Sequence, residues 1–160
     1  MVIGDSPEEV TYDNLNCAFR LIHGGAELIG MHRNRWWLTN GGPTIDSGAL
    51  VAGLEFSAEV RARILGKPAA EFFRLAASDV GAAAAARDGR GRVTRGELAM
   101  VGDDLWNDVF GAQRTGLRGI FVLTGKHGRP ELERAARQKR GGGRPDAVAA
   151  SLAEVVAALD

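Results

Sequence analysis

Apolar residues in the first third of the chain recur first at helical spacing and then in short runs. Steps of three, four and three separate the apolar positions Tyr12, Leu15, Phe19 and Ile22. This spacing predicts one face of a helix, and Gly24-Gly25 is expected to end it because glycine accepts the left-handed conformation at helix ends. Short apolar runs predict strands at 27–31 and 36–38, and the composition of 40–43 predicts a loop.

A mildly helical segment at 48–62 comes next, and from Ile64 onward predicted strands and helices alternate along the chain. Helices are expected at 48–62, from 67–68 onward, at 105–116, at 130–140 and after the capping box of Ser151 and Glu154, and strands at 64–65, 98–101 and 119–123. Such alternation is typical of a parallel α/β fold. The Gly/Ala/Arg-rich segment 79–96 leaves two interpretations open: its alanines extend the preceding helix, or it breaks the pattern, with a mobile loop at 88–92. The glycine run 141–143 predicts a flexible break.

Composition narrows the class of protein. The 160 residues favour one domain, or one domain with a small appendage. Lys+Arg and Asp+Glu number 20 each, and this balance argues against nucleic-acid binding, which shows as a basic excess. The lone Cys17 excludes an intramolecular disulfide, and no apolar run approaches the ~18 residues of a membrane span. A soluble cytoplasmic protein is therefore expected, with no nucleic acid and no membrane among its partners.

Acidic residues gather where one predicted strand ends and the next helix begins. The apolar run 98–101 is followed by Gly102, then by Asp103 and Asp104, and Asp108 lies further along. Ligands of open α/β sheets bind at this edge, and carboxylates with water are the oxygen ligands that Mg²⁺ prefers. The pattern indicates phosphate chemistry, although acids at a helix N-terminus also favour the helix dipole without any further role.

The order of three short motifs resembles the haloacid dehalogenase (HAD) superfamily. These are Gly66-Lys67-Pro68, then 100–104 with Asp108, then Thr124-Gly125-Lys126. The resemblance is nearest to the branch with a type-II cap, which includes the phospholysine phosphohistidine inorganic pyrophosphate phosphatases, and 15–32 is similar to the later part of that cap. It implies an α/β fold: the second half of a Rossmann-like parallel-sheet HAD core at 64–160, preceded by part of an α/β cap at 1–63.

The resemblance also implies roles for individual residues. Lys67 and Asp108 are expected to be catalytic, with Lys67 neutralising the phosphoryl group. Asp103 and Asp104 are expected to form the Mg²⁺ site, in which Asp104 or Asp108 supports the water shell of the metal. The implied reaction is hydrolysis of a phosphorylated small molecule through an aspartyl-phosphate. Thr39 and Asn40 lie where the family often places substrate-binding cap residues.

The nucleophile that such enzymes use has no counterpart in these residues. It is the first aspartate of an Asp-x-Asp motif at the end of an early strand, and a Ser/Thr motif follows it before the cap. No two aspartates of this chain lie two positions apart, and none of Asp5, Asp13 and Asp46 is expected to replace the nucleophile. We therefore expect a truncated phosphatase, inactive on its own. The alternative is a non-catalytic relative that acts as a binding or interaction protein.

Other sequence patterns are weaker evidence of function. Thr124-Gly125-Lys126 is not a P-loop, because the position five before Gly125 is Ile120 and His127 follows the lysine. The three histidines (His23, His32 and His127) show no ligand spacing and are expected to be ordinary surface or cap residues. The basic run 130–144 is expected to be a solvated helix and loop. A parallel sheet that lacks its central strand predicts an exposed sheet edge, through which copies of the chain would associate as a homo-oligomer.

Overall fold

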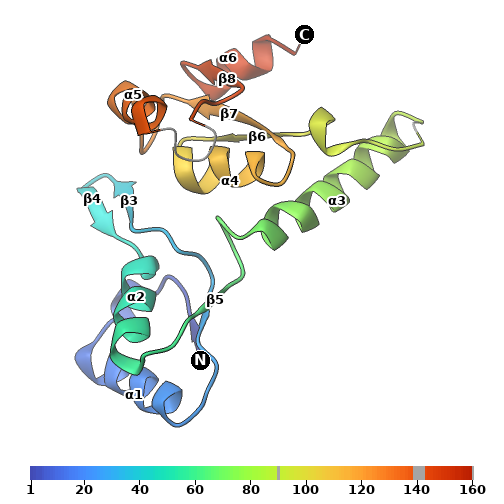
Figure 1. Ribbon diagram of the computed structural model, residues 1–160. Coiled ribbons are helices and arrows are strands. Elements are labelled where there is room, and N and C mark those ends of the chain that lie inside the picture. The colour runs from blue at the N-terminus through green and yellow to red at the C-terminus, as the bar shows by residue number, and fades with distance from the viewer. Residues whose placement is uncertain (90, 139–142, 160) are drawn as a thin grey trace. The chain divides into compact units, whose positions relative to one another are not determined.

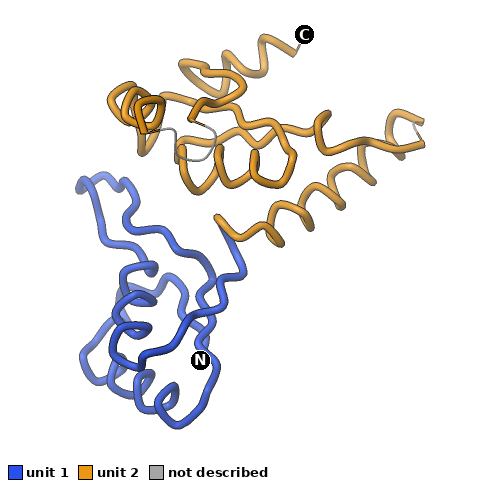
Figure 2. Tube along the Cα trace, in the orientation of Figure 1, with its two compact units in different colours: residues 1–67 blue, residues 68–160 orange. Residues whose placement is uncertain are grey.

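The computed structural model describes residues 1–89, 91–138 and 143–159, and it divides the chain into two compact units (Figures 1 and 2). Unit 1 comprises Met1–Lys67 and unit 2 comprises Pro68–Asp160. The sequence predicts a division four residues earlier, after Arg63. The basic and glycine-rich segments predicted at 88–92 and 130–144 fall partly outside the described residues.

Unit 1 is built on a small parallel sheet and two helices. Its elements are β1 (Val2–Ile3), η1 (Pro7–Glu9), α1 (Tyr12–His23), β2 (Ile29–Gly30), β3 (Trp36–Thr39), β4 (Gly42–Ile45), α2 (Ser47–Ala58) and β5 (Arg63–Ile64). The sheet has the order β1-β2-β5, and both of its strand pairs are parallel. Helix α1 begins where the Thr11 side chain accepts a hydrogen bond from the Asn14 N–H (3.2 Å). The predicted apolar face of this helix is confirmed at Ile22, which is buried against Leu28.

The segment predicted as a loop at 40–43 is a tight hairpin turn that enters a strand. β3 and β4 pair antiparallel, with Trp36 opposite Ile45 and Thr39 opposite Gly42. Gly42 has a φ of 101°, which a residue with a side chain rarely adopts. The prediction of a loop by composition was wrong for Gly42 and Pro43 because the pairing with β3 draws them into β4.

Unit 2 is an α/β unit around a second parallel sheet. Its elements are α3 (Ala70–Arg87), η2 (Arg95–Glu97), β6 (Ala99–Gly102), the π-helical turn η3 (Leu105–Val109), α4 (Phe110–Gln113), β7 (Arg118–Val122), α5 (Arg129–Gln138), β8 (Ala147–Ala149) and α6 (Leu152–Ala157). The strands have the order β6-β7-β8 and all pair in parallel. The predicted alternation of strands and helices around a parallel sheet is therefore confirmed. Within the described residues, β6 is an edge strand paired with β7.

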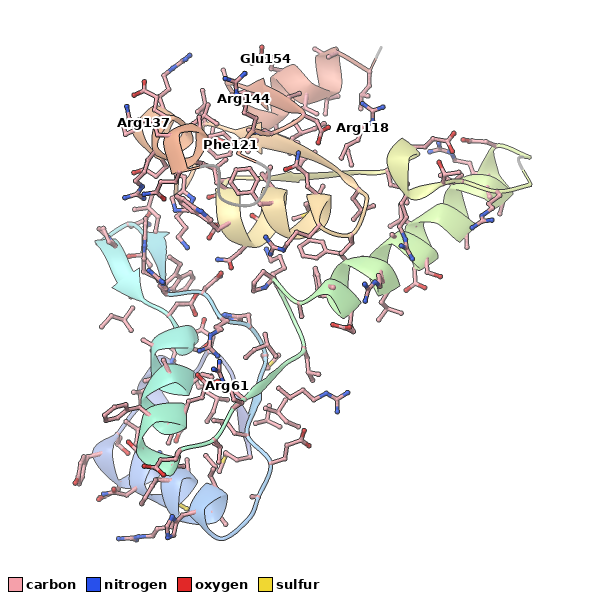
Figure 3. All side chains as sticks on the ribbon, viewed as in Figure 1. Arg61, Arg118, Phe121, Arg137, Arg144 and Glu154 are labelled. Carbon is pink, nitrogen blue, oxygen red and sulfur yellow. The ribbon has the colours of Figure 1, made fainter. Side chains whose placement is uncertain are left out.

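The core of unit 2 lies between its sheet and helices. Phe121 of β7, labelled in Figure 3, is fully buried and belongs to one cluster with η3 and α5. The members of that cluster are Leu105, Val109, Phe110, Phe121 and Ala135. A second cluster joins α3 to α4 through Phe73, Ala77 and Ala112. Asp146 fixes the start of β8, because its Oδ2 accepts hydrogen bonds from the Gly119 N–H (2.8 Å) and the Gln113 side chain (2.7 Å).

One local prediction is confirmed, and others differ from the structure. The alanines at 82–86 extend α3 to Arg87, so this interpretation of segment 79–96 is confirmed. The helix predicted at 105–116 begins as a π-helical turn and ends at Gln113, and β8 has no predicted counterpart. At the last helix, the Ser151 side chain accepts from the Glu154 N–H (3.3 Å), whereas the Glu154 carboxylate reaches the Ala150 N–H. In the part of the chain described, no helix is both long and apolar enough to cross a membrane.

Candidate active site

The acidic turn of unit 2 lies at the carboxyl end of β6, as the sequence predicts. Gly102 ends the strand, and Asp103 and Asp104 follow before η3 begins. A side chain at Gly102 would not fit, because a Cβ there would lie 2.5 Å from both Cβ and Oδ2 of Asp108. The absence of that side chain allows the buried Asp108 to fold back against the strand end, where its Oδ2 accepts a hydrogen bond from the Asp104 N–H (3.3 Å).

Asp104 is the cap of η3. Its Oδ1 accepts hydrogen bonds from the backbone N–H groups of Trp106 and Asn107, both at 3.0 Å. Its Oδ2 accepts from the Asn107 side chain (2.8 Å) and from the Lys126 ammonium (2.6 Å). Burial raises the pKa of the Asp104 carboxyl, but Lys126 and Asn107 lower it by more, so the pKa lies below its ordinary value. Both oxygens of Asp104 thus accept hydrogen bonds within the protein, and its predicted place beside Asp103 at a metal stays a prediction.

Asp103 differs from its neighbour because it is half-buried and because, among the described residues, hydrogen-bond donors reach only one of its carboxylate oxygens. Oδ2 accepts a hydrogen bond from the backbone N–H of Lys126 (2.7 Å), and the carbonyl oxygen accepts from the backbone N–H of His127 (3.2 Å). Oδ1 accepts none of the hydrogen bonds described. A Cβ on Gly125 would overlap this carboxylate, so only glycine allows the loop to approach so closely.

His127 packs beneath the acidic turn and is not the surface or cap residue that its spacing suggested. It is buried, its Nδ1 accepts a hydrogen bond from the Leu105 N–H (3.1 Å), and its ring meets Trp106 edge-on at 4.8 Å. Burial is the largest influence on this ring and lowers its pKa below the ordinary value, although Asp104 opposes that shift. The neutral imidazole therefore serves as an acceptor for a backbone donor at the start of η3.

Asp103 and Asp104 differ in how well their carboxylates could serve as ligands of a Mg²⁺ ion. No group of three or more His, Cys, Asp or Glu side chains among the described residues is arranged to hold a metal. Mg²⁺ keeps several waters and binds through one or two carboxylates. Asp103 meets that requirement with Oδ1, whereas the oxygens of Asp104 already accept from four donors. The donor set fits a hydrated Mg²⁺ held at Asp103.

The remaining predicted residues belong to unit 1, which is described by itself. Lys67 is half-buried, and its carbonyl oxygen accepts a hydrogen bond from the Arg33 N–H (3.3 Å). The Thr39 hydroxyl stabilises the hairpin turn, since it accepts from the Gly41 N–H (3.2 Å) and donates to the Gly42 carbonyl (3.0 Å). Asn40 is exposed at the same turn. Their predicted roles at a phosphate or substrate stay predictions.

Sequence reasoning missed one side-chain cluster in unit 1. Asp46 is buried and caps α2, because its side chain accepts a hydrogen bond from the Ser47 N–H (2.6 Å). The Nε2 atom of His32 lies 3.2 Å from the Ser47 hydroxyl and 3.5 Å from Asp46 Oδ1. Helix-capping aspartate is the only sequence signal that could have placed these residues together.

Comparison with known proteins decides the family. A family model described as HAD-hydrolase-like matches residues 64–155, which include the acidic turn and Lys67. The chain belongs to the HAD-like hydrolase family. This confirms the resemblance drawn from its three motifs, and the parallel sheets agree with the Rossmann-like architecture expected of an HAD protein.

The named relatives are longer proteins than this chain. A phospholysine phosphohistidine inorganic pyrophosphate phosphatase from Danio rerio is 38% identical over 135 residues, which are 83% of this chain and 46% of that protein. Haloacid dehalogenase-like hydrolase domain-containing protein 2 from Bos taurus is 39% identical over 127 residues, 79% of this chain and 45% of that protein. The chain thus spans about half the length of the curated relatives it matches.

Solved structures of HAD phosphatases share the fold. A 4-nitrophenylphosphatase from Thermotoga maritima matches with a TM-score of 0.75 at 30% identity, over 99% of this chain and 54% of that one. A glycerol phosphate phosphatase from Mycobacterium tuberculosis, solved in complex with magnesium, matches with a TM-score of 0.71 at 25% identity, over 96% of this chain and 41% of that one.

Proposed function

We propose that this chain supplies the cation-binding and phosphate-binding residues of a Mg²⁺-dependent phosphatase that acts on phosphorylated small molecules. The observation that carries the proposal is the carboxylate of Asp103. It lies at the carboxyl end of a parallel strand, its Oδ2 is held by a backbone N–H at 2.7 Å, and its Oδ1 accepts none of the hydrogen bonds described. The names of the relatives and structural neighbours, which are phosphatases, support the same reaction class.

Each residue has a physical task in that reaction. Phosphoryl transfer depends mainly on positioning and on neutralising the negative oxygens. A Mg²⁺ ion at Asp103 would supply part of that positive charge, and the Lys67 ammonium would supply more. Asp108 holds the backbone of the acidic turn through the Asp104 N–H, so its proposed contribution is to keep the carboxylate of Asp103 in place.

The chain offers no aspartate pair of the Asp-x-Asp type to act as the nucleophile. We therefore propose that its 160 residues bind a cation and a phosphate group but do not turn over substrate by themselves. The same observation favours the second candidate, a binding or interaction protein that keeps the scaffold without catalysis. The two candidates differ in whether the acidic turn supports phosphate hydrolysis once a nucleophile is supplied.

The test is hydrolysis of 4-nitrophenyl phosphate with and without Mg²⁺. The chain alone is compared with a chimera in which it follows the front half of the Danio rerio phosphatase. We expect no turnover by the chain alone, Mg²⁺-dependent turnover by the chimera, and at least a hundredfold loss of kcat in D103N. The surface variant R87M serves as the control, because the contact that the structure describes for the Arg87 side chain is an exposed ion pair with Asp88 at the end of α3. A folded chimera without activity would favour the binding protein.

A further inference from the structure

Lys126 holds two adjacent carboxylates by two different groups. Its backbone N–H donates to Oδ2 of Asp103 (2.7 Å), and its ammonium donates to Oδ2 of Asp104 (2.6 Å). Lys126 comes from the segment after β7, 22 residues further along the chain than Asp104. A single residue thus fixes both members of the acidic pair.

The ion pair between Lys126 and Asp104 is buried. The two side chains are 9% and 7% exposed, so neither charge is screened by water to the extent of a surface pair. The other contacts of Asp104 fall on the N–H groups of Trp106 and Asn107 and on the Asn107 side chain. All four donors together leave the Asp104 carboxylate saturated.

Saturation of Asp104 has a consequence for any cation at the acidic turn. A divalent cation that approaches Asp104 would have to displace the ammonium from Oδ2, and the positive charge of that ammonium repels it. The ammonium also cancels the charge of the Asp104 carboxylate. Of this pair, only Asp103 presents both a net charge and an oxygen that accepts none of the described hydrogen bonds.

We propose that Lys126 is a positioning and selectivity residue: it occupies Asp104 as a built-in cation, so that a divalent metal binds at Asp103 and not at Asp104. The inference rests on the proposed function, in which Asp103 is the metal ligand. It goes further by assigning opposite roles to the two neighbouring aspartates and by naming the residue that separates them.

The experiment measures Mn²⁺ binding to the 160-residue chain by electron paramagnetic resonance, with Mn²⁺ as the probe for Mg²⁺. K126M removes the ammonium but keeps the backbone N–H that holds Asp103. We expect K126M to bind Mn²⁺ about tenfold more tightly, since the acidic turn gains a net negative charge and Asp104 becomes accessible. K126R keeps the charge and is expected to stay within about threefold of the wild type.

D104N and the double variant K126M/D104N complete a double-mutant cycle with K126M and the wild type. D104N leaves the ammonium without its carboxylate, and we expect about tenfold weaker binding. In the double variant both charges are gone, so binding returns to the wild-type value. If Asp104 were itself a ligand, the double variant would bind as weakly as D104N, and the proposal would be overturned. A merely structural lysine would lower the melting temperature without tightening Mn²⁺ binding.

Two control variants, R87M and D103N, separate this proposal from the one on which it rests. R87M changes the net charge as K126M does, and we expect no change in binding. D103N should abolish binding in every background, and a D103N variant that still binds Mn²⁺ would overturn the metal assignment itself. Equal affinities of K126M, R87M and wild type, or no binding by any of them, overturn the role of Lys126, whereas the chimera assay tests the phosphatase independently. If K126M does not fold, the difference between D104N and the double variant decides.

Discussion

Both units place a buried aspartate at the start of a helical element beside a histidine, but only in unit 2 does a second carboxylate precede that aspartate. In unit 1, Asp46 caps α2 and lies 3.5 Å from His32. In unit 2, Asp104 caps η3 and its Oδ1 lies 3.6 Å from Nδ1 of His127. The difference is the preceding residue, which is the exposed Ile45 in unit 1 and the half-buried Asp103 in unit 2.

The two capping aspartates differ in the donors that their carboxylates accept. Asp46 accepts from the Ser47 N–H, whereas Asp104 accepts from two backbone N–H groups, from the Asn107 side chain and from the Lys126 ammonium. In unit 2 a second carboxylate precedes the capping aspartate, and the proposed metal ligand is this neighbour, Asp103. In unit 1 the corresponding residue is Ile45, which offers a cation no ligand.

Removal of the two capping aspartates should have the largest effects and should separate the units most clearly. D104A removes the carboxylate that the buried Lys126 ammonium contacts at 2.6 Å, and we expect a loss of about 3–5 kcal/mol in the free energy of unfolding. D46A removes one backbone hydrogen bond from the start of α2, and a loss of about 1 kcal/mol is expected. Urea unfolding measures both, with the exposed D79A as control, expected within about 0.5 kcal/mol of wild type. Equal losses for D104A and D46A would contradict the distinction.

Two glycines allow a sharper test, because a side chain would overlap a neighbour at each. A Cβ on Gly48 would overlap the Asn34 carbonyl of unit 1, and a Cβ on Gly125 would overlap the Asp103 carboxylate of unit 2. We expect G48A and G125A each to lower stability by about 1–3 kcal/mol. Only G125A should also weaken Mn²⁺ binding, because only it displaces a proposed ligand.

G53A is the matched control for these two variants. Gly53 is exposed on α2 and a Cβ there would meet nothing within 4 Å, so alanine should stabilise the helix by about 0.5–1 kcal/mol. Weaker Mn²⁺ binding in G48A would show that the cation responds to overall stability and not to the position of Asp103.

Much of the fold could be predicted where the pattern is local. The three-four-three spacing of apolar residues predicts α1, and the alternation of apolar runs with helices predicts the parallel sheet of unit 2. β8 was missed because Ala147-Val148-Ala149 is a short run of small residues whose strand conformation depends on pairing with β7. The π-helical turn of η3 was also missed. It is made by i→i+5 hydrogen bonds from the N–H groups of Val109 and Phe110 to the carbonyl oxygens of Asp104 and Leu105, which depend on how the whole turn packs.

The candidate site, like the fold, could be predicted from the sequence only in its local part. A strand followed by glycine and aspartate predicts where Asp103 lies, and that rule is local. The contacts of Lys126 and His127 with the acidic turn depend on the parallel pairing of β6 with β7, which brings the ends of both strands to one edge. Residues 22 positions apart can be placed together only once that pairing is known, so their roles could not be derived from spacing.

The dependence of stability on pH should give the smallest effect and the finest comparison. Burial lowers the pKa of His127 in the folded protein, so the unfolded chain binds the proton more readily. Stability should therefore be fully present above the unfolded histidine pKa of about 6.5 and should fall as the pH is lowered through that value. Protonation would also remove the acceptor that Nδ1 provides for the Leu105 N–H.

Urea unfolding of wild type and H127N between pH 7.5 and 5 (about the range in which histidine titrates) measures this contribution. H127N lacks the titrating ring, so it should be less stable at pH 7.5 and should lose less stability on acidification. An equal slope in both proteins would show that the buried histidine beneath Asp103 and Asp104 does not set the pH response of unit 2.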